Sequence, residues 1–311
     1  MSLAACWVLR ELPWARVIGL LGGQRPWWTS LAVLANALVL PLWALEWWRL
    51  APSRERPPIG RSFEVVALTS ATMNTIPFFA GEASAVVLLV ARAGLSRAGA
   101  LSVLALDQLL VGVAKLAVIG TAMLLAPLPV PLRAGVGTLA ATVALGGIAM
   151  LLLSRSAGVS WTPGPRHAAR AIAFVRAWAA RLEVLREPRG LAFVLALALG
   201  KKALEIAAIL AVQQSLGVVL PWWSSVLVVA ALGIGTLVPL APANLGTYEA
   251  TAFLAYRYLG VPADTALGLA MLHHLAFLLP AIGTGWSLLL LRQFGAIRTR
   301  PGEVAASTVR S

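Results

Sequence analysis

The chain has 311 residues, of which 59% are hydrophobic and only 12% are charged. Soluble domains carry roughly 25% charged residues, so this composition excludes an ordinary soluble domain and predicts an integral membrane protein. The net charge of +13 does not indicate nucleic-acid binding, because the arginines lie in short loops between apolar runs, as topology signals do.

The N-terminal part contains an amphipathic segment and the first predicted spanning helix. Residues 10–25 mix arginines and a glutamate with large apolar residues, which predicts an in-plane amphipathic segment; a truncated first transmembrane helix is the alternative. Residues 27–48 are apolar, and at about 1.5 Å per residue they can cross a hydrocarbon core of about 30 Å. The loop 49–62 carries four arginines and is therefore predicted to be cytoplasmic.

The next apolar segment, residues 63–93, is broken near its middle. Pro77 and Gly81 interrupt it, and Glu82 follows directly. Proline removes a backbone donor and clashes with the preceding helical turn, so a continuous helix is excluded here. Non-helical backbone at membrane depth survives only where protein or a water-filled cavity satisfies it. We therefore expect a broken hairpin, either re-entrant or fully crossing.

Two spanning helices and a long polar section follow. Residues 100–126 and 134–153 are predicted to span the membrane. The polar section 154–190 is rich in arginine, and apolar residues recur at helical spacing over 166–186. This pattern predicts a basic amphipathic helix that binds anionic headgroups on the cytoplasmic surface. A plain solvated linker helix is the alternative.

The second half repeats the order of the first half. Residues 190–216 are predicted to span, and the apolar run after Trp222 ends in the sequence Pro239-Leu-Ala-Pro-Ala-Asn-Leu-Gly-Thr-Tyr-Glu249. Its prolines and its carboxylate again predict a broken hairpin. A last span covers 265–291, and residues 292–311 are predicted to be a disordered cytoplasmic tail.

The positive-inside rule sets the direction of each segment. With 49–62, 154–190 and the C-terminus in the cytoplasm, parity makes residues 63–93 start and finish inside. By the same parity, residues 222–262 start and finish outside. The two broken hairpins therefore open to opposite sides of the membrane.

A weak internal repeat agrees with this arrangement. Glu82 is followed after 12 residues by Gly94, and Glu249 is followed after 11 residues by Gly260. Two similar halves of opposite orientation, each with a broken hairpin, are typical of inverted-repeat transporters. We predict an all-α polytopic membrane domain over residues 1–291 with two inverted repeats. Each repeat is a hairpin plus a spanning helix, over residues 63–126 and 222–291.

Both hairpins carry motifs that resemble those of the lysylphosphatidylglycerol synthase/flippase transmembrane-region family of prokaryotes. Pro77-Phe-Phe-Ala-Gly81-Glu82 fits its Pro-x-x-x-Gly-Glu motif, and Pro242-Ala-Asn-Leu-Gly246-Thr-Tyr-Glu249 fits its Pro-Gly-x-x-Gly-x-x-Glu motif. Gly260-Val261 and Ala266-Leu267 fit the turn and helix that follow. The resemblance covers roughly residues 27–291. It implies a lipid-handling protein of the prokaryotic inner membrane, whose two-part relatives move an aminoacylated lipid made by a fused soluble domain.

The chain also departs from this family pattern. The glycine usual after the motif proline is Ala243, and positions 83–91 lack the basic residue often found after the first Gly-Glu. Asp107-Gln108 and His273-His274 stand where arginines are common. No polar stretch is long enough for the soluble synthase domain, so we expect no lipid synthesis, and the lysyl headgroup is not carried over.

Ionisable residues inside apolar segments are the candidate site residues, because charge at membrane depth is costly. Glu82 and Glu249 could bind a cationic headgroup or couple to protons; capping of broken helix ends is the alternative. Lys201 is predicted to pair with Glu205 at i,i+4 or to hold a lipid phosphate. The candidate binding or coupling residues are Glu82, Glu249, Asp107, Lys201, His273, Asn244 and Asn74. The candidate hairpin residues are Pro77, Gly81, Pro239, Pro242 and Gly246.

Enzyme signatures are sparse. The single cysteine, Cys6, and the histidines fit no metal-site spacing, and no phosphate loop or nucleophile elbow occurs. We therefore expect neither a metal nor another cofactor. The favoured interpretation is a protein that binds and translocates an amphipathic lipid, with membrane lipids as its partners. The rival interpretation is an accessory or enzyme subunit that presents a lipid to a separate transferase.

Overall fold

The computed structural model describes residues 14–76, 80–125, 130–156, 173, 175–237 and 241–298. All regular elements in these residues are helical, which confirms the all-α prediction. In chain order the elements are α2 (Trp14–Gly22), α3 (Pro26–Leu50), α4 (Ile59–Thr75), α5 (Ala80–Ala91), α6 (Arg97–Leu125), α7 (Val130–Ser156), η1 (Glu183–Arg186), α9 (Pro188–Ser215), α10 (Trp223–Gly235), η2 (Pro242–Asn244), α11 (Thr247–Tyr258) and α12 (Ala263–Arg298).

Within the described residues, four helices are long and apolar enough to cross a membrane. They are α3, α6, most of α7 and most of α12. The helix α9 has 28 residues, which is also long enough, but it carries Lys201, Lys202 and Glu205 in its middle. Its charged residues find partners inside the bundle, as described below. The chain is a multi-pass membrane protein.

The two predicted hairpins are pairs of short helices. The helices α5, α10 and α11 have 12, 13 and 12 residues, or roughly 18–20 Å at 1.5 Å per residue, too short to span alone. The first break follows Ile76, and the second lies between Gly235 and Thr247. Pro77 and Pro239 themselves lie outside the described residues.

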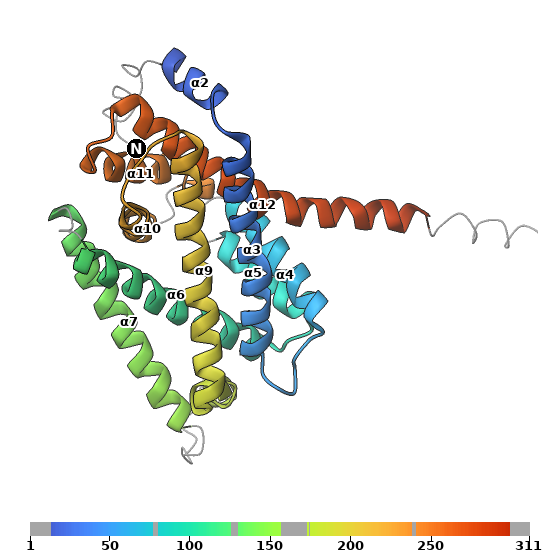
Figure 1. Ribbon diagram of the computed structural model, residues 1–311. Helices are drawn as coiled ribbons and strands as arrows, with labels where there is room; N and C mark the ends of the chain where they lie inside the picture. Colours follow the sequence, from blue (N-terminus) through green and yellow to red (C-terminus); the bar gives the residue numbers. More distant parts are fainter. Residues whose placement is uncertain are drawn as a thin grey trace, which may run out of the picture.

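The two halves of the chain interlock rather than lie apart. Figure 1 shows α3 and α9 lying side by side along much of their length, with α12 crossing them steeply. The helix α4 of the first half packs against α12 of the second half, and α10 of the second half packs against α6 of the first half. The element η2, inside the second break, contacts α4. This exchange of partners brings the two breaks close together.

Glycines allow the closest of these approaches. A Cβ on Gly81 of α5 would lie only 2.7 Å from the Cα of Met73 in α4. A Cβ on Gly285 of α12 would lie 2.6 Å from the Cβ of Ala71. Such contacts leave no room for a side chain without moving backbone, so α5 and α12 both sit directly on α4.

One end of the bundle joins the loops that are predicted to be cytoplasmic. Arg92, after α5, donates to Glu64 near the start of α4 over 3.0 Å. Arg49 at the end of α3 pairs with Glu187 just before α9 over 2.6 Å. The first hairpin therefore begins and ends at the same face, as parity predicts.

The opposite end joins the start of α3, the end of α9 and the start of α10. The backbone N–H of Arg25 donates to the carbonyl of Ser215 over 2.8 Å. The hydroxyls of Ser224 and Ser225 each donate to Oε1 of Gln213 over 3.3 Å. The second hairpin thus starts at the other face from the first one.

The turns after the two hairpins are alike. Gly94 has φ 77° between α5 and α6, and Gly260 has φ 82° between α11 and α12. Glycine takes this left-handed conformation without steric cost, so both positions need it for the same turn. The inverted repeat itself stays a prediction. The two similar glycine turns are one structural feature that agrees with it.

Two predicted boundaries differ from the structure, and a third segment is described only in part. Of residues 10–25, positions 14–22 form α2, which a short turn separates from α3. Residues 10–13 lie outside the described residues, and the in-plane placement of the segment stays a prediction. In the predicted helix 166–186, residues 175–180 are helical but 183–186 are a 3₁₀ turn, because Arg181 turns aside to bind Glu55. Of the predicted tail, residues 292–298 continue α12, and 299–311 lie outside the described residues.

Candidate functional site

Two adjoining cavities of about 210 and 370 Å³ lie between the hairpin breaks. Together they are bordered by α3, α4, α5, α6, α9, α10, η2, α11 and α12. The residues that line both cavities are Asn36, Asn74, Lys115, Glu205, Thr236, Asn244 and Phe277. We call this combined space the central cavity.

Both breaks contribute directly to the central cavity. Asn74 and Gly81 flank the first break, and Thr236 and Asn244 lie within the second one. Ala243 and Asn244 have φ 53° and 55°, a left-handed conformation that costs roughly 1–2 kcal/mol for a residue with a Cβ. This conformation turns the chain so that the Asn244 side chain borders the cavity. Ala243 stands where the family motif has glycine, and glycine would adopt this left-handed conformation without strain.

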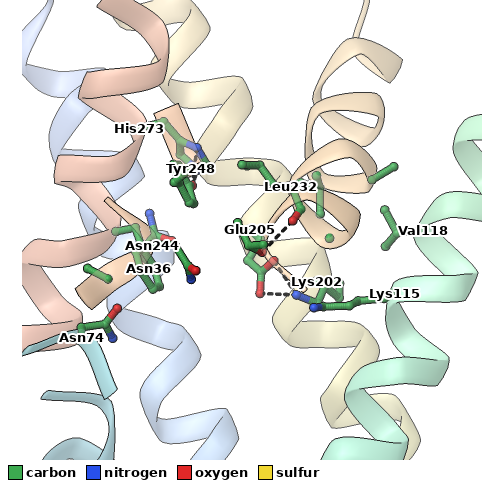
Figure 2. A pocket seen from close by; sticks show the side chains of 16 residues that line it. Asn36, Asn74, Lys115, Val118, Lys202, Glu205, Leu232, Asn244, Tyr248 and His273 are labelled. Carbon is green, nitrogen blue, oxygen red and sulfur yellow. Dashed lines mark hydrogen bonds and ion pairs between the residues drawn. The ribbon is translucent and has the colours of Figure 1, made fainter. Parts of the chain in front are cut away.

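The cavity contains an ion pair and a further lysine. Lys202 of α9 holds both carboxylate oxygens of Glu205, at 2.7 and 2.8 Å. Lys115 of α6 points into the same space (Figure 2) and makes no hydrogen bond or ion pair with any described residue. Its aliphatic stem lies against Gly233 of α10, where a Cβ would be 3.7 Å from Lys115 Cγ.

Three asparagine amides face these charges across the cavity (Figure 2). Asn36 donates to the carbonyl of Ala32 over 3.0 Å, and Asn74 donates to that of Ser70 over 2.8 Å. Each leaves a second amide N–H and its oxygen for another partner. Oδ1 of Asn244 is buried and has no donor among the described residues.

An aromatic group closes one wall of the cavity. The Tyr248 hydroxyl and Nδ1 of His273 are 2.7 Å apart. The Tyr248 ring stacks on His274 with ring centres 4.1 Å apart and planes 14° apart. Tyr248, His273 and Phe277 line the cavity, so α11 contacts α12 at this wall.

Glu249 lies behind this wall and does not line the cavity. One carboxylate oxygen accepts the backbone N–H of Gly246 over 2.7 Å, at the start of α11. The other oxygen is 2.7 Å from Nδ1 of His274. This geometry is that of a helix cap tied to α12, which is the alternative role considered for this residue.

A second charged group is buried between α3, α6 and α9. Lys201 lies 2.5 Å from Glu46 and 3.8 Å from Asp107. Asp107 also accepts the indole N–H of Trp43 over 3.1 Å. The exposed fractions of Glu46, Asp107 and Lys201 are 0%, 2% and 6%, so this cluster is closed off, with Trp43 between it and the cavity.

The structure thus distributes the predicted site residues over several places. Asn74, Asn244 and His273 line the central cavity; Asp107 and Lys201 lie in the closed cluster. The side chain of Glu82 lies outside the described part, although its backbone belongs to α5. The predicted Lys201–Glu205 pair is not formed, because Lys202 takes Glu205 and Lys201 faces Glu46 of the neighbouring helix. Among the predicted hairpin residues, Pro242 opens η2 and Gly246 has φ 85°.

Sequence reasoning did not select several cavity residues as site candidates. They are Asn36, Lys115, Lys202, Glu205 and Tyr248. One signal was available for the lysines: all three in the chain lie inside apolar segments, while the loops carry arginine.

A family model described as Lysylphosphatidylglycerol synthase TM region matches residues 1–285 of the chain. The chain belongs to this family. A comparison with curated proteins gives no match. In this member of the lysylphosphatidylglycerol synthase TM-region family, the two motifs that carry the resemblance lie at the two hairpin breaks. Gly81 and Asn244, one from each motif, both border the central cavity.

Proposed function

We propose that this protein binds an amphipathic lipid by its headgroup in the central cavity and moves that headgroup between the two leaflets. The observation that carries the proposal is a cavity that contains charged and amide side chains and is bordered by both hairpin breaks, inside an apolar helical bundle. In membranes, irregular backbone of this kind is tolerated where it lines a cavity. In inverted-repeat transporters, such broken segments form the substrate site.

The arrangement of the hairpins supports a route through the membrane. The first hairpin starts at the end of the bundle that holds Arg49 and Arg92, and the second starts at the opposite end. In our proposal the arginine-rich end faces the cytoplasm. Movement of either hairpin away from the cavity would open it toward that hairpin's side, so the two hairpins act as alternate gates.

Reconstituted vesicles test the proposal directly. Purified protein in liposomes is expected to speed the exchange of a fluorescent phospholipid between leaflets, measured by dithionite quenching. Gly233→Leu places a side chain beside the Lys115 stem in the cavity and should bring exchange down to the protein-free rate. Gly120→Leu is the matched control, because a Cβ at Gly120 has no atom within 4 Å, and it should exchange lipid at the wild-type rate.

Two outcomes would contradict translocation. Wild-type vesicles that exchange lipid no faster than empty vesicles would remove the proposal. Lipid binding in the cavity without exchange would instead favour a subunit that presents the lipid to a separate transferase. Equal exchange by both glycine variants would show that lipid moves along a different path.

A further inference from the structure

The charges of the described side chains that line the central cavity do not balance. Among the residues that the structure describes, its lining contains three charged side chains, Lys115, Lys202 and Glu205. Glu205 gives both carboxylate oxygens to Lys202, at 2.7 and 2.8 Å. Lys115 has no ion-pair or hydrogen-bond partner in the described part of the chain. The described lining therefore carries one net positive charge, with two ammonium groups in the same space (Figure 2).

An unpaired ammonium inside an apolar bundle is costly. The nearby Lys202 adds repulsion, because Glu205 neutralises only one of the two cations. A bound anion would remove both penalties at once. Lysine binds phosphate oxygens as a point charge, without the fixed geometry that arginine requires, and so suits a group that must later leave.

We propose that Lys115 binds the phosphate of the lipid headgroup, and that the central cavity selects headgroups of net negative charge. This inference rests on the proposed function and gives its substrate class: a lipid phosphate without a compensating amino group. The same lysine could also hold free inorganic phosphate, and the experiment below separates these two sources.

The other buried carboxylates whose side chains the structure describes are not available to a cationic aminoacyl headgroup. Glu249 is turned away from the cavity and holds Gly246 and His274. Glu46 and Asp107 face Lys201 in the closed cluster and do not reach the cavity. Within the described residues, no carboxylate on the cavity wall is left for a second cation. The specificity of this protein would therefore differ from that of a transporter that carries a lysylated lipid.

The neutral lining has groups for the rest of such a headgroup. Asn36 and Asn74 each donate one amide N–H to a carbonyl of their own helix, and the second amide N–H of each can donate to a ligand. Buried Oδ1 of Asn244 has no donor among the described residues, and a headgroup hydroxyl would supply one. Lys115 and the three amides come from four elements of both halves, so a bound headgroup would bridge the two hairpins.

Thermal stability of the purified protein in detergent provides the binding assay, because a ligand that binds only the folded state raises the melting temperature. The probes are dihexanoyl phosphatidic acid, dihexanoyl phosphatidylcholine, a short-chain lysyl-phosphatidylglycerol and inorganic phosphate. The phosphatidic acid is expected to stabilise the wild-type protein most. Removal of the charge in Lys115→Met should weaken its binding about tenfold or more, as for other hydrogen bonds to charged groups.

A second variant moves the affinity in the opposite direction. Glu205→Gln removes the carboxylate from Lys202 and leaves two free cations, so phosphatidic acid should bind more tightly than to the wild type. Arg54→Gln removes one positive charge from a surface loop and is the control, with no expected change. Lys115→Met removes an unpaired charge and should not lower the melting temperature without ligand, which separates lost binding from lost folding.

Several results would overturn the inference. Unchanged phosphatidic acid binding by both Lys115→Met and Glu205→Gln would remove Lys115 as the phosphate site. Equal or tighter binding of the lysylated lipid would contradict the charge selection, and equal binding of inorganic phosphate would show that the lipid part plays no role. Leaflet exchange that is normal in Lys115→Met would contradict this inference alone, whereas Lys115-dependent binding without exchange would contradict only translocation.

Discussion

At the scale of single residues, the packing of the helices determines which buried charges pair with one another. Lys201 and Lys202 are neighbours on α9, yet they point to different partners. Lys201 meets Glu46 on α3 and Asp107 on α6, and Lys202 meets Glu205 one turn along its own helix. In a low-dielectric interior, removal of one member leaves the others uncompensated, which costs far more than a surface pair.

This grouping predicts a large effect at Lys201. Lys201→Met leaves Glu46 and Asp107 buried without a cation and should lower the free energy of unfolding by about 3–5 kcal/mol. The double variant Lys201→Met with Glu46→Gln removes one of those charges and should recover part of that loss. Melting temperatures in detergent measure both effects. A single variant as stable as the wild type would show that Glu46 and Asp107 carry no negative charge that Lys201 must neutralise.

The same residues show where sequence reasoning succeeds and fails. Asn74 and Asn244 could be selected because they flank breaks, and the breaks follow from proline and glycine chemistry. The partner of Lys201 could not be found from helical spacing, because Glu46 lies on another helix more than 150 residues away in the sequence. Lys115 was visible as an odd lysine in an apolar run, but its lack of a partner is a property of the packing.

At the scale of elements, the broken hairpins are the part of the fold that the sequence predicts best. Turn chemistry located both breaks and the glycine turns that follow them. The ends of elements were harder to predict, because they depend on tertiary contacts. The helix in the arginine-rich section ends near Arg181, whose guanidinium binds Glu55 in the loop after α3 over 2.8 Å.

Glu55 ties three elements together at the predicted cytoplasmic face. Its carboxylate accepts the backbone N–H and the hydroxyl of Ser96 and pairs with Arg181. Burial opposes ionisation of this carboxyl group, but the hydrogen bonds from Ser96 and Arg181 and the charge of Arg181 outweigh it. Together they lower the pKa of Glu55 below its ordinary value of 4.5.

The lowered pKa of Glu55 predicts a pH-dependent contribution to stability. A group whose pKa is lower in the folded state stabilises the protein above the unfolded value, here 4.5, and loses that contribution as the pH falls through the folded value. The melting temperature of Glu55→Gln should therefore lie below that of the wild type at neutral pH, and the gap should close in acid. Melting curves between about pH 7 and pH 3 test this; a gap that widens in acid would contradict it.

At the scale of the whole molecule, the interlocked halves place both breaks at one polar cavity. The helices α4 and α10 each pack against the long helix of the other half. The cavity is therefore lined by elements of both halves. Four of the five predicted spans coincide with the long apolar helices α3, α6, α7 and α12, because hydropathy shows them directly. The opposite opening of the two hairpins, which follows from arginine placement, stays a prediction. The closure of the cavity around Lys115 depends on the packing of distant helices.

Side-specific labelling of the cavity tests the central claim most directly. In a Cys6→Ser background, Asn74→Cys places one thiol in the cavity, and Val66→Cys on the same helix, at a position that is 0% exposed, is the control. Sealed right-side-out vesicles and sealed inside-out vesicles are treated separately with a membrane-impermeant maleimide. A lipid translocator with alternate gates predicts that Asn74→Cys is labelled from both sides and Val66→Cys from neither. Labelling of Asn74→Cys from one side only, with and without added phosphatidic acid, would contradict the account.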